Sequence, residues 1–183
     1  MQNNKSMDER IIEHCRRLVA GKDKIRVLFV CLGNICRSPA ADGVLKSIVA
    51  SRGESERWEI DSAGTGGWHV GQLPDKRMRV HALRRGLTLD HICRQVHPSD
   101  FEDFDLIVAM DSDNEQNLRS MAPTLADRDK VVPMAAFIRM ATRYDHIPDP
   151  YYEGAEGFEL VLDLLEDACG NMTEIFSQER QAP

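Results

Sequence analysis

The chain has 183 residues, of which 42% are hydrophobic and 29% are charged, enough for one domain with an ample core. Its formal net charge of −7 argues against a nucleic-acid backbone or an anionic membrane as the main partner. No apolar run approaches the roughly 18 residues that span a bilayer, and the first residues lack the apolar core of a signal peptide. We therefore expect a cytoplasmic protein that acts as a monomer.

The first 24 residues are polar and are expected to form an N-terminal extension. Apolar residues spaced three or four apart predict a helix over about residues 8–20. We expect residues 25–177 to form the domain and residues 178–183 a polar tail. The sequence of the extension indicates no function.

Residues 25–39 carry the pattern on which the functional analysis depends. Apart from Arg26, residues 25–31 are apolar, which is typical of a short, fully buried strand. A Gly-Asn pair then predicts a tight turn. Ser38 followed by Pro39 is typical of a helix N-cap and the first helical residue. The pattern therefore predicts a strand, a tight loop and a helix in succession.

A loop that leads into a helix N-terminus gathers backbone N–H groups at the positive end of the helix dipole, and so can bind an anion. Arg37 supplies a planar fork that matches two phosphate oxygens. The field that binds the anion would also stabilise a thiolate at Cys31. We therefore expect Cys31 to attack phosphorus and Ser38 to donate a hydrogen bond to the departing sulfur. The alternative is a buried core cysteine at the end of a strand.

The rest of the chain alternates between strands and helices. The predicted strands are 58–61, 106–110 and 131–132, and the predicted helices are 40–51, 75–85, 112–121 and 157–174. Residues 62–67 are rich in small residues and predict a flexible loop. The alternation predicts a single-domain, three-layer α/β fold with a parallel sheet and helices on both faces. Ligands of such sheets bind beyond the carboxyl ends of the strands.

A thiolate that attacks a phosphate ester needs an acid to protonate the leaving oxygen. Asp149 is the leading candidate, because Pro148 and Pro150 stiffen the backbone on both sides of it. Asp111 also follows a predicted strand, but we expect it to cap the next helix. Asp61 is similarly placed and lacks the stiffening prolines.

The five cysteines fit neither a disulfide framework nor a zinc site. They are odd in number and widely scattered, so we expect them to be reduced. Cys31 and Cys36 lie five residues apart, but no second closely spaced pair follows. No metal and no other cofactor is therefore expected. A further hypothesis is that Cys36 protects Cys31 by forming a reversible disulfide under oxidant.

The run from Cys31 to Pro39, CLGNICRSP, resembles the signature of the low-molecular-weight protein tyrosine phosphatases. The resemblance continues through residues 60–65, Trp68, His91, 110–111 and 149–152. It implies a four-stranded sheet in the order 2-1-3-4. It also implies Cys31 as the nucleophile, Arg37 as the phosphate clamp and Asp149 as the general acid. The implied phosphate-binding loop consists of Leu32, Gly33, Asn34, Ile35, Cys36 and Ser38.

The same resemblance extends to the surroundings of the loop. Ser62 and His91 are expected to hydrogen-bond Asn34, a strained residue, while the other five histidines are expected at the surface or in packing. Aromatic side chains on two loops are expected to wall a deep slot for a phenyl ring: Trp68, Tyr151 and Tyr152. Such a slot favours a phosphotyrosine-containing protein or an aryl phosphate as substrate, with inorganic phosphate or another oxyanion as inhibitor.

Three other functions are compatible with parts of this pattern. Thiol-dependent arsenate reductases share the loop, but they use two further cysteines downstream, and only Cys93 lies in that region. Relatives specific for phosphoarginine typically have Thr at the position of Ile35, so Ile35 favours phosphotyrosine. A non-catalytic phosphate-binding module should lack the nucleophile or the acid, and both are present.

Overall fold

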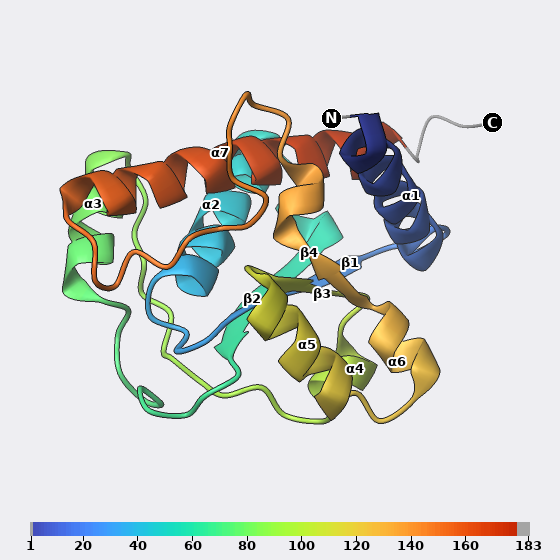
Figure 1. Cartoon of the computed structure of the whole chain (residues 1–183), viewed down its shortest axis with the longest axis horizontal. Helices are drawn as coiled ribbons and strands as arrows, with labels where there is room; N and C mark the ends of the chain where they lie inside the picture. The colour runs from blue at the N-terminus through green and yellow to red at the C-terminus, as the bar shows by residue number, and fades with distance from the viewer. Residues whose placement is uncertain (1, 179–183) are drawn as a thin grey trace.

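The computed structural model describes the backbone of residues 2–178 and the side chains of residues 8–177. Four parallel strands form one sheet: β1 (Ile25–Cys31), β2 (Trp58–Gly64), β3 (Leu106–Ala109) and β4 (Val131–Pro133). Their order is β2-β1-β3-β4, which confirms the predicted topology. The sheet is the middle layer of an α/β fold (Figure 1).

Helices cover both faces of the sheet, as predicted. They are α1 (Gln2–Val19), α2 (Arg37–Ser51), α3 (Lys76–Arg84), α4 (Asp100–Asp103), α5 (Ser112–Met121), α6 (Leu125–Asp129) and α7 (Ala155–Gln178), with short 3₁₀ helices η1 (Ser55–Arg57) and η2 (Met134–Phe137). In Figure 1, α2 and α7 lie above the sheet, and α4, α5 and α6 lie below it. None of the helices within the described residues has the length and apolar character needed to cross a bilayer.

From Val27 to Cys31 the inner strand β1 is buried on both faces, which explains the continuous apolar sequence of this part of the strand. Val27 and Phe29 belong to the larger core, which includes residues of α2 and α7. Leu28 and Val30 point the other way, into a smaller core with residues of α4 and α5. Since successive side chains of a strand alternate between faces, β1 fixes both layers of helices relative to the sheet.

The N-terminal residues form a helix that is longer than predicted. Cys15 and Val19 of α1 are buried in the larger core, and α1 packs against η2 and α7. The helix is therefore docked on the body of the protein. The polar tail predicted at 178–183 lies outside the described side chains, although α7 extends to Gln178.

One segment predicted as a flexible loop belongs to the sheet instead. Ser62, Ala63 and Gly64 continue β2, with Ser62 paired to Phe29 and Gly64 paired to Cys31. A Cβ atom on Gly64 would lie 2.8 Å from the Leu32 carbonyl oxygen and 3.0 Å from the Asn34 backbone nitrogen, both in the loop after β1. Glycine is therefore needed here for the close approach of two backbones, and the prediction of a loop at 62–64 was wrong.

Candidate active site

The loop after β1 lies at the carboxyl edge of the sheet. The next two strands of the chain, β2 and β3, lie on opposite sides of β1. This is the point at which ligands of open parallel sheets bind. The backbone N–H groups of residues 32–36 donate to no acceptor within the described part of the chain. Together with the N-terminus of α2 they form a group of free donors suited to an anion.

The carbonyl groups of the same loop are held on the outside by hydrogen bonds. The N–H groups of Thr65 and Gly66 donate to the carbonyl oxygens of Cys31 and Leu32 at 2.9 and 2.8 Å. The N–H of Asp75 donates to the Ile35 carbonyl at 2.8 Å. Because C=O and the following N–H of a trans peptide point in opposite directions, these bonds turn the N–H groups toward the anion site.

Ser38 does not cap α2, contrary to the sequence prediction. The helix begins at Arg37, and its N-cap residue, Cys36, makes no side-chain cap. The Ser38 hydroxyl oxygen instead lies 3.0 Å from Cys31 Sγ and accepts a hydrogen bond from Asn34 Nδ2 at 2.9 Å. Its proton faces either Cys31 Sγ or the Ala63 carbonyl at 3.3 Å, and an ionised sulfur is the stronger acceptor.

Asn34 is held in a left-handed conformation, with φ +56°, by hydrogen bonds on all sides. Its Nδ2 donates to Ser38 Oγ and to Ser62 Oγ at 2.9 and 3.0 Å. Its Oδ1 accepts from His91 Nε2 and from the Arg94 N–H, both at 2.9 Å. A non-glycine residue in this region costs about 1–3 kcal/mol, which this network offsets. Both hydrogen bonds expected of Asn34, to Ser62 and to His91, are present.

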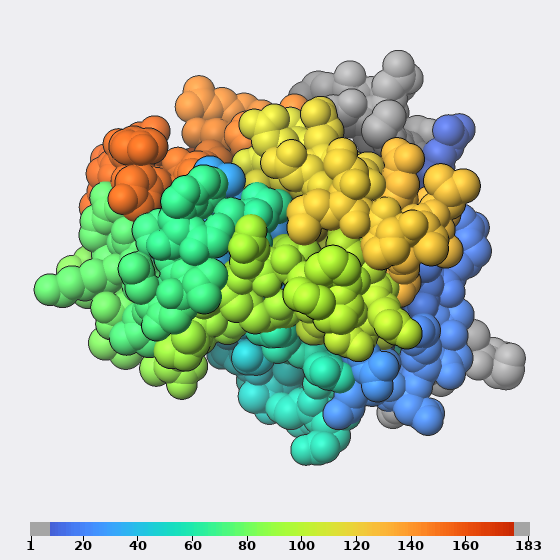
Figure 2. All heavy atoms as spheres, turned by 90° about the horizontal axis from the view of Figure 1, so that it is seen from below, coloured from blue at the N-terminus to red at the C-terminus, as the bar shows by residue number. Residues whose placement is uncertain are grey.

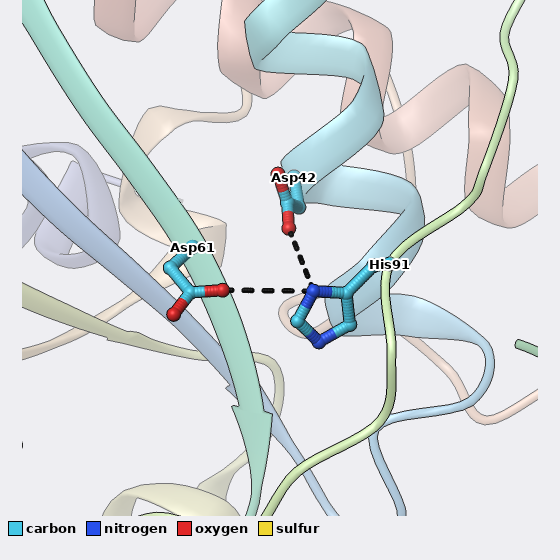
Figure 3. Close-up of side chains that lie close together, drawn as sticks. All are labelled: Asp42, Asp61 and His91. Carbon is cyan, nitrogen blue, oxygen red and sulfur yellow. Dashed lines mark ion pairs between the residues drawn. The ribbon is translucent and has the colours of Figure 1, made fainter. Parts of the chain in front are cut away.

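His91 is itself oriented by two acidic side chains from different elements (Figure 3). Since Asn34 Oδ1 can only accept, His91 Nε2 carries a proton, and Nδ1 faces the carboxylates of Asp42 and Asp61 at 3.6 Å each. Burial lowers the pKa of His91 from its ordinary value, and the two carboxylates oppose this. Burial likewise raises the pKa of Asp42.

Arg37 is 3% exposed and lies beneath the loop with three acceptors. Its Nη1 donates to Asp111 Oδ2 at 2.5 Å and to the Ile147 carbonyl at 3.1 Å, and its Nη2 lies 3.6 Å from Asp149 Oδ2. Burial opposes the charge of Arg37, but Cys31, Asp111 and Asp149 together hold its pKa above the ordinary value. The guanidinium therefore stays charged at the base of the anion site.

Asp111 and Asp149 both approach Arg37, but their surroundings differ. Asp111 Oδ1 accepts from the Asn114 N–H at 2.8 Å and caps α5, so both of its oxygens are engaged. Asp149 Oδ1 accepts from the Tyr151 N–H at 3.1 Å, and the side chain is half-exposed toward the cavity. Cys31, Arg37 and Asp149 thus border one cavity from three parts of the chain.

A family model described as low molecular weight phosphotyrosine protein phosphatase matches residues 26–182. The chain belongs to this family. A putative member from Synechocystis is 43% identical over 155 residues, which cover 85% of this chain and 98% of that protein.

Solved structures resemble the fold as well. A protein tyrosine phosphatase from Entamoeba histolytica, solved with Hepes in its active site, is 43% identical, with a TM-score of 0.81 over 86% of this chain and 99% of that one. A Drosophila arginine phosphatase is 35% identical, with a TM-score of 0.76 over 82% of this chain and 96% of that one.

The walls of the phosphatase cavity come from two exposed loops. Trp68 is 70% exposed and Tyr152 is 93% exposed, while Tyr151 packs edge-on against Tyr152 with ring centroids 4.9 Å apart. All three border the cavity, and so does His69, which was expected at the surface or in packing. In Figure 2, seen from below, a small blue patch of the chain after β1 lies between the green segment after β2 and the orange segment before α7.

Two further groups bear on the chemistry of the phosphatase. Among the described residues, Asp42, Asp61 and His91 are the one cluster of potential metal ligands, with donor atoms within 4.8 Å. Lys46 Nζ lies 2.7 Å from Asp42, and Arg94 lies 3.0 Å from Asp61, so both carboxylates already have cationic partners. We infer that the cluster orients His91.

Cys36, in the loop after β1, is buried and borders the same cavity as Cys31. Burial, and then the negative charges of Asp75, Cys31 and Asp149, raise the pKa of its thiol. Cys36 therefore keeps its proton at neutral pH. A reversible disulfide between Cys36 and Cys31 stays a prediction.

Proposed function

We propose that the chain is a metal-independent phosphotyrosine phosphatase that works through a phosphocysteine. The Cys31 thiolate attacks phosphorus, the bond between phosphorus and the tyrosine oxygen breaks, and Asp149 gives that oxygen its proton. In the second step Asp149 takes a proton from water, which attacks phosphorus and releases the Cys31 sulfur. The observation that carries the proposal is the cavity bordered by Cys31, Arg37 and Asp149.

The loop supplies the electrostatic part of the reaction. Charge on the transferred phosphoryl group is spread over its equatorial oxygens, which preorganised N–H donors and a charged guanidinium stabilise. The free N–H groups of residues 32–36 and the buried Arg37 have this arrangement. Ser38, 3.0 Å from Cys31 Sγ, would stabilise the sulfur as it leaves.

The walls of the cavity support an aromatic phosphate ester as the substrate. Trp68 and Tyr151 border the cavity with aromatic rings against which a phenyl group can pack, and such walls favour phosphotyrosine over the shorter phosphoserine. Relatives in the family are named phosphotyrosine phosphatases. The similarity to a Drosophila arginine phosphatase favours phosphoarginine as a second candidate, whereas Ile35 in the loop favours phosphotyrosine.

We further propose that the enzyme acts as a cytoplasmic monomer and is inhibited by inorganic phosphate and vanadate. A thiolate nucleophile needs a compartment in which thiols stay reduced, and the five cysteines are free. Arsenate reduction is the less favoured activity, because Cys93 is buried with its thiol on the Asn34 carbonyl, and no second cysteine lies near it in the sequence.

A set of assays on the wild-type enzyme tests these functions together. Hydrolysis of p-nitrophenyl phosphate and of a phosphotyrosine peptide is expected with chelator present, and vanadate should block it. Phosphoarginine should be a much poorer substrate, and thioredoxin-coupled reduction of arsenate should be absent. Faster hydrolysis of phosphoarginine than of the phosphotyrosine peptide would reverse the choice of substrate.

Replacing Trp68 by alanine is expected to raise KM for a phosphotyrosine peptide about 5- to 20-fold and to leave kcat within about twofold. The ring would contact the substrate equally in the ground and transition states, so its loss affects binding more than chemistry. Leu125→Ala, a substitution at an exposed apolar residue of α6, is the control and should change neither constant. A fall in kcat at constant KM would instead mean that Trp68 positions the loop.

A further inference from the structure

Cys93 makes a contact with the phosphate loop that no sequence pattern indicates. The residue is 1% exposed, and its thiol donates to the main-chain carbonyl oxygen of Asn34 at 2.8 Å. It follows β2 by almost thirty residues and belongs to the same segment as His91 and Arg94, which bind the side chain of Asn34. This segment therefore holds Asn34 by both its side chain and its backbone.

The Asn34 carbonyl differs from its neighbours in the kind of donor that holds it. The carbonyls of Cys31, Leu32 and Ile35 are bound by backbone N–H groups. The Asn34 carbonyl accepts no hydrogen bond from a backbone N–H of the described residues, and the Cys93 thiol is the donor it has. A substitution at one side chain can therefore release this peptide group, while the carbonyls of Cys31, Leu32 and Ile35 stay held.

The thiol is a donor throughout the neutral pH range. Burial, followed by the nearby Cys31, raises the pKa of Cys93 to about 11. It therefore keeps the proton that the hydrogen bond requires. Among the described residues, the Cys93 thiol is the donor to the Asn34 carbonyl oxygen.

The Asn34–Ile35 peptide is trans, so its carbonyl and the Ile35 N–H point in opposite directions. With the carbonyl directed at Cys93, the Ile35 N–H has no acceptor among the described residues, and Ile35 borders the cavity. A flip of this peptide would replace a donor to the anion by a carbonyl oxygen. Asn34 already has a left-handed φ of +56°, so its backbone depends on such restraints.

We propose that Cys93 is a positioning residue, whose thiol fixes the Asn34–Ile35 peptide so that the Ile35 N–H binds the phosphoryl oxygens. The proposal rests on the proposed phosphatase function and deepens it. Cys93 is not among the residues that border the cavity. It acts through the orientation of one backbone amide, and its effect should appear wherever an oxyanion binds.

Two substitutions separate the hydrogen bond from the packing. Cys93→Ser keeps a donor, whereas Cys93→Val roughly keeps the volume and removes the donor. We expect Cys93→Val to raise the inhibition constant of inorganic phosphate and to lower kcat/KM for p-nitrophenyl phosphate, each about 3- to 10-fold, with Cys93→Ser within about twofold of wild type. Cys15→Ala, which removes another buried thiol from the core, is the control and should match wild type.

A direct readout is the amide resonance of Ile35 during titration with inorganic phosphate. It should shift strongly in the wild type and in Cys93→Ser, and weakly in Cys93→Val. Equal phosphate inhibition constants in the Ser and Val variants would overturn the proposal, as would an unchanged Ile35 shift in Cys93→Val. A wild-type enzyme that neither hydrolyses p-nitrophenyl phosphate nor binds phosphate would refute the proposed function itself.

Discussion

Replacing Cys31 by serine is expected to lower kcat by about 10⁴-fold or more while inorganic phosphate still binds. A serine hydroxyl has a far higher pKa than a thiol, so the loop cannot ionise it at neutral pH. The N–H groups of residues 32–36 and Arg37 are untouched by the change, which is why the anion site should persist. The measurement is hydrolysis of p-nitrophenyl phosphate together with calorimetric titration of phosphate.

The matched test is Cys36→Ser in the same loop. Both cysteines border the cavity, but only Cys31 has Ser38 Oγ at 3.0 Å. After reaction with a ³²P-labelled substrate and an acid quench, the wild type and Cys36→Ser should carry a labelled phosphoenzyme. The Cys31→Ser variant should carry no label. Label retained in Cys31→Ser and lost in Cys36→Ser would assign the nucleophile to Cys36. The Cys31→Ser protein would also retain bound phosphotyrosine proteins and so identify the physiological substrate.

Local signals in the sequence were enough to predict most of the fold. The apolar run of β1, the helical period of α2 and the cap of α5 each depend on residues that lie close together in the sequence. Asp75 and Asp111 accept from the N–H groups of Arg77 and Asn114, as residues at helix starts commonly do. The alternation of strands and helices then left a parallel sheet as the consistent arrangement.

Tertiary contacts overrode two local signals. Ser38 and Pro39 are typical of the first residues of a helix, but the chain enters α2 earlier, and the Ser38 hydroxyl binds Asn34 and faces Cys31 instead. Residues 62–64 have weak strand propensity, yet β2 continues through them because β1 supplies a partner along its whole length.

Two residues near the loop were missed because nothing local indicates them. Cys93 meets Asn34 across 59 residues of sequence, and a lone buried cysteine is ordinarily part of a core. His69 borders the cavity and hydrogen-bonds Gln72 Oε1 at 3.1 Å. In the sequence, a histidine beside a Gly-rich stretch is typical of an exposed loop. Finding either residue from the sequence would have required the path of the chain between β2 and α4.

The two aspartates near Arg37 show how one cation can serve two different carboxylates. Asp111 is bound at 2.5 Å and has its other oxygen on the Asn114 N–H, so it is tied into the scaffold. Asp149 lies 3.6 Å from Arg37, with a side chain that is 43% exposed, so it is free to meet a leaving group. Accessibility therefore favours Asp149 as the acid and Asp111 as the residue that orients Arg37.

Replacing Asp149 by asparagine is accordingly expected to lower kcat roughly 10²- to 10⁴-fold and to leave phosphate binding within about twofold. The amide oxygen can still accept from the Tyr151 N–H, so the shape of the cavity stays, but no proton is available for the leaving oxygen. The loss should be larger for phenyl phosphate than for p-nitrophenyl phosphate, because nitrophenolate departs without a proton.

Asp145→Asn, at an exposed residue four positions earlier in the same connection, is the matched control and should behave as wild type. Asp111→Asn should weaken phosphate binding through Arg37 and should lower the rate by similar factors for the two esters, because it does not supply the proton. Leaving-group dependence thus separates the two aspartates even if both variants are slow. A wild-type kcat in Asp149→Asn, with the dependence appearing in Asp111→Asn instead, would transfer the acid role to Asp111.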